Sequence, residues 1–352
     1  MFDLKTIKIT PLLETLHLEK ISDAIYFSSK YSGYVSNSRL GLLNPRQDGS
    51  PEKFFEGFKE GGFNTSLQLG SAVHELILQP ESFELADEID KPSAKLGAMA
   101  DALYPVHMEH GVVTLDDFIK ASNKIEYYKD KVTSRLYDEA IKQCAPYWNQ
   151  RRIMEMNLEN DKEQIFLDHK TRETVISCVQ SLKNDQAVMD LLHPKGIIED
   201  PLSENEQAVL LDVQIDCPNG KSFIVKLKSK VDNYTIDAES NTLVVNDVKT
   251  IGRYVSEIDN NIARYHYSRE MAMYLYLMRL CAMRFYNMDN PHIHANYLVV
   301  STVPNFYTKV RSVTYHELVC GFKEFQTLLK YVGYLIGYKD YSLDEPAGRY
   351  KL

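Results

Sequence analysis

The stretch Lys221–Ile251, KSFIVKLKSKVDNYTIDAESNTLVVNDVKTI, decides how the rest of the chain is interpreted. Val, Ile, Phe, Tyr and Thr are frequent in both flanks, whereas the middle, 237–241, is the run Asp-Ala-Glu-Ser-Asn that is typical of a turn. The pattern predicts two β-strands joined by a turn. We expect the first strand to end near Asp232 and the second to end near Lys249.

Two aspartates and this lysine have a spacing that suits a metal site. Alternate residues of a strand share a face, so Asp247 and Lys249 would point the same way, with Cα atoms about 7 Å apart. Asp232 and Asp247 are separated in sequence by a number of residues that suits a hairpin. The return of the chain would bring both acids to one end of the sheet. Two carboxylates favour Mg²⁺ or Mn²⁺, and a nearby ammonium can orient water or stabilise a phosphoryl group. The alternative is a solvated strand with alternating charges.

These residues resemble the PD-(D/E)xK nucleases, in particular the RecE-type exonucleases and their phage relatives. Lys230-Val231-Asp232 stands where that family has a basic residue, a spacer and its first metal-binding acid. Asp247-Val248-Lys249-Thr250 looks like its D-x-K-[ST] strand. The resemblance implies metal-dependent cleavage of DNA, typically from duplex ends, whereas spacing alone predicts only a metal site.

A second stretch, 69–80 (LGSAVHELILQP), predicts a helix that small residues open and Pro80 closes. His74 lies among apolar residues, where a lone histidine is ordinarily part of the core. The pattern G-[ST]-A-x-H-x-L-x-L-x-P nevertheless closely resembles the helix of RecE- and RecB-type nucleases whose histidine faces the metal. The resemblance therefore implies an active-site role for His74.

The resemblance also assigns residues outside these two motifs. Glu206, in a predicted strand, occupies the region where the family often has another active-site acid. A later helix of the family carries Gln four residues before Tyr; Tyr274 matches, but Glu270 holds the Gln position. A carboxylate cannot donate to a phosphate unless it is protonated. Either Glu270 binds the metal indirectly, or the substrate contact has moved to Arg269.

In the arrangement that the resemblance implies, Asp232 and Asp247 hold one or two Mg²⁺ or Mn²⁺ ions. The Val248 carbonyl, His74 and Glu206 are further candidate ligands, and Lys249 orients or helps to deprotonate the water. The candidates for DNA contacts, besides Arg269, are Arg39, near a predicted helix start, and Lys230; the alternative for both is an ordinary solvated cation.

Composition is ordinary for a soluble globular protein, with 44% apolar and 25% charged residues in 352. No apolar run approaches the ~18–20 residues of a membrane span, and the N-terminus lacks a signal-peptide core, so we expect a cytoplasmic protein without a membrane partner. Five scattered cysteines predict neither a disulfide framework nor a zinc site. A net charge of −9 counts against a generic nucleic-acid binder, although a local basic channel can lie on an acidic protein.

The sequence thus predicts an α/β protein with a restriction-endonuclease-like core: a mixed β-sheet of about five strands flanked by helices. We expect one nuclease domain over 1–352, with a mainly helical elaboration at 84–200. The central sheet and the active-site helix are expected at 201–316. The segment 12–21 is compatible with a helix.

The functional hypothesis is an Mg²⁺-dependent exonuclease acting on duplex DNA ends in phage or bacterial recombination or repair. By analogy with relatives, its partners would be a single-strand annealing protein and further copies of itself in a ring-shaped homo-oligomer. Two alternatives stay open. One is a catalytically inactive DNA- or protein-binding module, favoured by Glu270 and the acidic balance, and the other is a structure-specific endonuclease.

Overall fold

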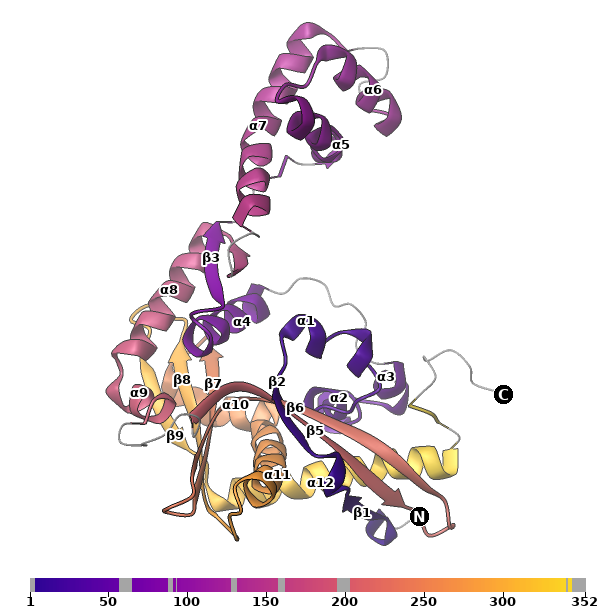
Figure 1. Cartoon of the computed structure of the whole chain (residues 1–352), viewed down its shortest axis with the longest axis vertical. Helices are drawn as coiled ribbons and strands as arrows, with labels where there is room; N and C mark the ends of the chain where they lie inside the picture. Colours follow the sequence, from indigo (N-terminus) through magenta and orange to yellow (C-terminus); the bar gives the residue numbers. More distant parts are fainter. Residues whose placement is uncertain are drawn as a thin grey trace. The chain divides into compact units, whose positions relative to one another are not determined.

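The computed structural model describes residues 4–56, 65–87, 91–92, 94–127, 132–157, 162–194, 203–339 and 341–343. Contacts divide the chain into two compact units, one comprising Met1–Gln79 and Thr174–Leu352 and the other comprising Pro80–Glu173 (Figure 1). That the whole chain acts as one nuclease domain stays a prediction.

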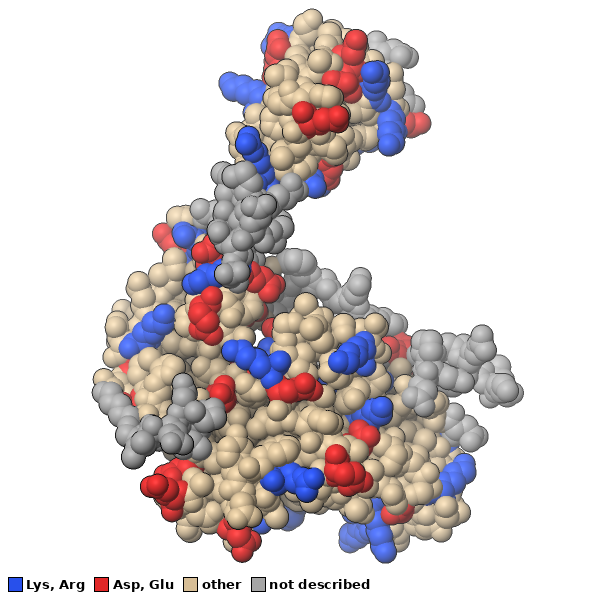
Figure 2. Space-filling model, in the orientation of Figure 1, with Lys and Arg blue, Asp and Glu red and all other residues tan. Residues whose placement is uncertain are grey.

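The surface mixes charges of both signs. On the face shown in Figure 2, Lys and Arg side chains are interspersed with Asp and Glu. Among the helices of the described residues, none has the length and apolarity needed to cross a membrane.

The first unit is built on a mixed seven-stranded sheet in the order β1-β5-β6-β7-β8-β9, with β2 also pairing with β5. The strands are β1 (Lys8–Pro11), β2 (His17–Lys20), β5 (Ser203–Asp216), β6 (Ser222–Asp237), β7 (Thr242–Ile251), β8 (His292–Ser301) and β9 (Thr308–Ser312). All neighbours are antiparallel except β7 and β8, which are parallel. The predicted α/β fold with a mixed sheet flanked by helices is confirmed; β5–β9 are its five predicted strands, and β1 and β2 extend it.

Two local predictions were wrong. The segment 12–21 is not a helix: it holds the short 3₁₀ turn η2 (Leu13–Thr15) and strand β2. The reason is tertiary, because the outer edge of the long strand β5 offers unpaired main-chain groups, and β1 and β2 pair with its two halves. Strand β6 also does not end near Asp232 but continues to Asp237, whose carboxylate accepts hydrogen bonds from the turn amides of Glu239 and Ser240.

The predicted hairpin contains a fork. Strands β6 and β7 pair from Asp237–Thr242 back to Asn233–Asn246, and the next pair in that register would be Asp232 and Asp247. There the pairing stops, because β6 continues alongside β5 while β7 continues alongside β8. The point where β6 and β7 separate, at the two aspartates, is called the fork below.

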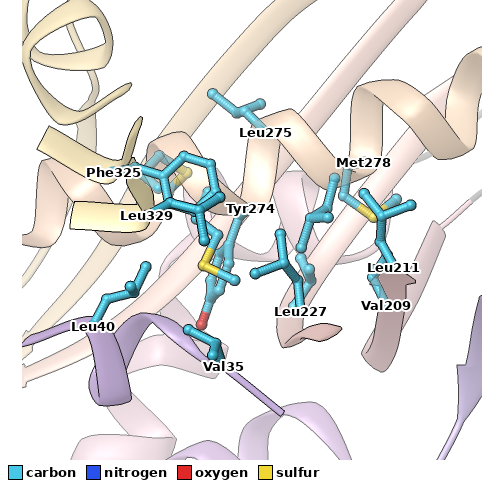
Figure 3. Packing of buried hydrophobic residues seen from close by; sticks show 14 of the residues in the cluster. Val35, Leu40, Val209, Leu211, Leu227, Tyr274, Leu275, Met278, Phe325 and Leu329 are labelled. Atoms are coloured by element: carbon cyan, nitrogen blue, oxygen red, sulfur yellow. The ribbon is translucent and has the colours of Figure 1, made fainter. Parts of the chain in front are cut away.

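Helices of the first unit surround this sheet. They are η1 (Leu4–Thr6), α1 (Asp23–Tyr26), η3 (Ser29–Tyr31), α2 (Asn37–Gly41), η4 (Pro45–Gln47), α3 (Pro51–Glu56), α4 (Thr65–Leu78), α9 (Gln186–Leu192), η5 (Val255–Glu257), α10 (Ile258–Tyr265), α11 (Tyr267–Phe285) and α12 (Tyr315–Lys339). Apolar residues of α2, β5, β6, α11 and α12 meet in one core (Figure 3). Gly321 of α12 permits close packing on α11, since a Cβ there would lie 2.0 Å from the Ser268 carbonyl oxygen.

The second unit is mainly helical. It contains α5 (Ala94–His110), α6 (Leu115–Ile125) and α7 (Ser134–Asn157), together with the parallel strands β3 (Phe83–Asp87) and β4 (Glu163–Leu167); α8 (His169–Asn184) begins in it. Trp148 is buried in its core and donates to the Ala100 carbonyl at 2.8 Å. Trp148 is thus a packing element of this unit.

Candidate active site

The two predicted acids lie on opposite sides of the fork. Asp232 Oδ2 accepts a hydrogen bond of 2.8 Å from the main-chain N–H of Val248, in place of the strand pairing that ends one residue earlier. Asp247 is fully buried and Asp232 is nearly so. The alternative of a solvated strand with alternating charges is therefore wrong for these two residues, because neither carboxylate faces bulk water.

A second acid and the predicted histidine join Asp232. His74 Nδ1, from α4, lies 3.3 Å from Asp232 Oδ2. One ligand atom from each of His74, Glu206 and Asp232 lies within 4.8 Å of the others. Glu206 reaches this point because Asn205–Asn233 and Gln207–Val231 pair on either side of it, which leaves Glu206 and Asp232 level with each other across an unpaired gap. Its φ of 55° lies in the left-handed region, which is uncommon for a non-glycine residue and is enriched at functional sites.

Asp247 brings an unused ligand atom to the same fork. Its Oδ2 is a buried side-chain oxygen that has no hydrogen-bond partner among the described residues. Such orphans are rare in proteins, because an unpaired buried acceptor costs about 1–3 kcal/mol. A carboxylate oxygen, two further carboxylates and an imidazole suit a divalent cation of the Mg²⁺ or Mn²⁺ type. His74, Glu206 and Asp232 therefore fit a metal ion, and Asp247 offers a further oxygen on the neighbouring strand.

Lys249 lies between two carboxylates. Its Nζ is 2.8 Å from Asp247 Oδ1 and 3.0 Å from Glu270 Oε2, and it lies 4.8 Å from the centre of the Tyr267 ring. Glu270 is on the first turns of α11, and its other oxygen is 3.5 Å from the Tyr274 hydroxyl. Sequence reasoning missed Tyr267, although its place three residues before Glu270 puts both on one helical face.

Burial dominates the electrostatics of the site. It raises the pKa of Asp232 to about 7, with the charge of Glu206 adding to the effect and that of Lys249 opposing it. Burial likewise raises the pKa of Asp247 well above its ordinary value. Burial and the charge of Lys249 lower the pKa of His74, which keeps its imidazole neutral and able to bind a metal. Burial alone would lower the pKa of Lys249, but the charges of Asp247 and Glu270 raise it well above its usual range.

The three candidate DNA-binding cations have internal partners. Arg39 is buried and donates to the carbonyls of Phe54, Ser32 and Tyr34. Arg269 is buried and donates to Asn37, Gln47 and Glu324. Lys230 pairs with Glu206 at 2.9 Å and also with Asp23. Arg269 is thus directed away from Glu270, and a DNA contact by any of the three stays a prediction.

A cavity of about 990 Å³ opens beside Glu270 and Tyr274. Its other lining residues include Phe27, which is 73% exposed, and Lys228. The Lys228 ammonium lies 4.3 Å from the Tyr26 ring centre, and burial lowers its pKa to about 8. Sequence reasoning missed Phe27 because one exposed aromatic in a short helical segment has no periodic signal.

Comparisons with known proteins add little. No family model matches this chain, and no curated protein matches it. A solved structure from Eubacterium rectale, described as a candidate exonuclease, aligns with a TM-score of 0.45 and 11% identity, covering 91% of this chain and 87% of that one. That similarity is too low to carry an argument, so the site is interpreted from its own residues.

Proposed function

We propose that this protein is a metal-dependent deoxyribonuclease that hydrolyses phosphodiesters at the fork, and that it acts as an exonuclease on duplex ends. The observation that supports this best is the buried Asp247 Oδ2, which has no hydrogen-bond partner within the described part of the chain and belongs to the strand that separates from β6 next to the His74, Glu206 and Asp232 cluster. A buried set of acids with raised pKa values is costly unless a cation compensates it. Lys249, which lies between Asp247 and Glu270, places a positive charge beside the proposed metal ligands.

Each residue of the site has a distinct role in this proposal. Asp232, Asp247 and Glu206 would hold Mg²⁺ or Mn²⁺, with His74 and the Val248 carbonyl as further ligands. When bound, such an ion supplies Lewis acidity and lowers the pKa of water that it binds. Lys249, which its two carboxylate partners keep protonated, donates hydrogen bonds that orient water or stabilise the charge on the phosphoryl oxygens. Glu270 holds Lys249 in place.

The cavity beside the site supports a nucleic-acid substrate. It adjoins Glu270, and its aromatic lining, with the exposed ring of Phe27, offers a surface on which bases stack, although its cations Arg39, Lys228 and Lys230 already have partners inside the protein. The overall acidity of the chain is compatible with this, because local fields and not net charge guide a polyanion into a cleft. The preference for duplex ends, a ring-shaped homo-oligomer, a single-strand annealing partner and a cytoplasmic role in recombination belong to the same proposal through the RecE-type resemblance.

Digestion of end-labelled linear duplex with Mg²⁺ tests the proposal, with covalently closed circular duplex in parallel. We expect the linear substrate to be degraded and the closed circle to survive, because an exonuclease needs an end. Lys249→Ala should lower the rate by about 10²-fold or more. Lys323→Ala, which removes an exposed lysine of α12, is the matched control and should leave the rate unchanged.

Cleavage of the closed circle would instead indicate the structure-specific endonuclease. Lack of cleavage of either substrate would favour the inactive module, an alternative that has its own support because Lys249 is already paired with two carboxylates. The metal centre can be tested separately. We expect Mn²⁺ to raise the melting temperature of the wild-type protein, and Asp232→Ala to remove that shift.

A further inference from the structure

A single row of amide side chains crosses the sheet beside the fork. Asn205, Asn233, Asn246 and Asn296 come from β5, β6, β7 and β8, and they are directly paired in the strand register. Each Nδ2 donates to the Oδ1 of the preceding asparagine, at 2.8 Å from Asn233, 2.7 Å from Asn246 and 3.0 Å from Asn296. The side chains thus form one continuous ladder, called the asparagine ladder below.

Both ends of the asparagine ladder are anchored. At one end, Ser312 of β9 donates to Asn296 Oδ1 at 2.9 Å. At the other, Asn205 Nδ2 donates to the carbonyl of Leu78, the last residue of the helix that carries His74. Every bond runs in the same direction, so each amide polarises the next. The ladder therefore links five strands through side chains, and its last bond ends on a main-chain carbonyl of the His74 helix.

Three ladder asparagines are sequence neighbours of the three candidate carboxylate ligands. The dipeptides are Asn205-Glu206, Asp232-Asn233 and Asn246-Asp247. Asn246 and Asp247 are successive residues of β7 and therefore point to opposite faces. In the other two dipeptides the contacts divide in the same way, since Glu206 and Asp232 lie with His74 whereas Asn205 and Asn233 bond to each other. The asparagine side is covered by α9, where Asn246 Nδ2 also donates to the Leu191 carbonyl at 3.2 Å.

The ladder lies where main-chain support is weakest. Asn233–Asn246 is the last main-chain pair before the fork, and the strands are not paired at Asp232 and Asp247. The register between β5 and β6 is also interrupted at Glu206 and Asp232, with pairs only on either side. Besides the Val248–Asp232 hydrogen bond and the Lys230–Glu206 ion pair, the amide bonds of the ladder connect the strands next to these gaps.

We propose that Asn205, Asn233 and Asn246 are positioning residues that set the spacing of Glu206, Asp232 and Asp247 before a metal ion arrives. The proposal rests on the metal-dependent function proposed above and extends it to the opposite face of the sheet. Because a preformed site has less ordering left to do when the ion binds, the ladder would raise metal affinity in addition to stability. Asn296 has no acid beside it in sequence, so its bond reaches a ligand only indirectly, through Asn246, and its loss should disturb the site less.

Amide hydrogen exchange of the metal-free protein tests the proposal, comparing wild type with Asn246→Ala and the matched control Asn296→Ala. The readout is the exchange rate of the Val248 N–H, which donates to Asp232, divided by that of buried amides in α11, a helix that carries neither substitution. This ratio corrects for any general loss of stability. We expect Asn246→Ala to raise it about tenfold, and Asn296→Ala to leave it near the wild-type value.

Calorimetric titration with Mn²⁺ gives the second readout. The dissociation constant of the Mn²⁺ complex should rise about tenfold in Asn246→Ala and change less than twofold in Asn296→Ala. Equal changes in both variants, in exchange or in affinity, would overturn the proposal and leave the ladder as a general stabiliser. If the wild type binds no Mn²⁺, the metal function fails while the exchange ratio still decides the positioning role. Should Asn246→Ala not fold, Asn205→Ala at the half-buried end replaces it, with the amides flanking Glu206 as readout.

Discussion

At the fork, the two faces of the sheet differ in whether their buried polar groups have hydrogen-bond partners. On one face, Asp247 keeps an unpartnered oxygen, and burial raises the pKa values of Asp247 and Asp232. On the other face, one residue away in each strand, the asparagines of the ladder exchange hydrogen bonds from β5 to β9. Satisfied amides stabilise a structure, whereas unsatisfied acids cost stability and persist where they are used. The contrast locates function on the acid face and support on the amide face.

Two separate substitutions at neighbouring positions of β7, Asp247→Asn and Asn246→Asp, should distinguish these roles most strongly. Asp247→Asn removes a candidate metal ligand, so we expect Mg²⁺-dependent cleavage to fall by about 10³-fold or more. Because the Lys249 ammonium keeps Glu270 as a charged partner and an amide oxygen can still accept from it, the free energy of unfolding without metal should fall by only about 1 kcal/mol or less. Cleavage assays and urea unfolding in chelator measure the two effects.

The matched variant is Asn246→Asp, which places a new carboxylate in the ladder. It breaks the bond to Asn233 and buries an unpaired charge, so the free energy of unfolding should fall by about 3 kcal/mol or more. If the two variants changed stability in the same direction and by the same amount, the faces would not differ as described.

The same contrast explains what could be predicted from the sequence. The hairpin, its turn at 237–241 and the convergence of Asp232, Asp247 and Lys249 follow from strand periodicity and spacing, which are local properties. His74 and Glu270 were identified through the resemblance, and the geometry places His74 beside Asp232 and Glu270 beside Lys249. Their roles in catalysis stay predictions.

What could not be predicted depends on pairing between distant segments. Strands β1 and β2 exist because β5 has a free edge, and the ladder exists because Asn205, Asn233, Asn246 and Asn296 fall on one rung. In sequence each is only an asparagine within a strand pattern, where it is normally disfavoured. That anomaly, repeated beside three acids, was the available signal. Arg39 and Arg269 illustrate the opposite difficulty. Their positions near the motifs suggested DNA contacts, but both side chains donate hydrogen bonds to groups inside the protein.

A smaller effect is expected in the pH dependence of stability, which should differ between the wild type and Asp232→Asn. The folded pKa of Asp232, about 7, lies above the ordinary value near 3.8. A carboxyl with a raised folded pKa contributes stability that is fully present below its unfolded pKa and is lost as pH rises through the folded pKa. Metal-free wild type should therefore lose stability between about pH 4 and pH 7 relative to Asp232→Asn.

Urea unfolding in chelator across that window measures the difference. Subtracting the Asp232→Asn curve removes the opposite contribution of His74, whose lowered pKa destabilises the fold as pH falls. Saturating Mn²⁺ should abolish the loss in wild type, because ion binding requires the ionised carboxylate. Parallel curves for the two proteins without metal would show that the burial of Asp232 imposes no such cost.

The smallest expected effect comes from Glu270→Gln, which alters charge on the acid face without touching a proposed direct ligand. Glu270 lies 3.0 Å from Lys249 and lines the cavity beside the site. Removing its charge lowers the repulsion of a polyanion and frees Lys249 to donate to phosphate, while an amide keeps the shape of the side chain. We expect KM for DNA to fall severalfold with kcat within about twofold of wild type, and the fall should shrink at high salt. A rise in KM would mean that the carboxylate itself contacts the substrate through a bound ion, and Glu270 would then belong with the metal ligands.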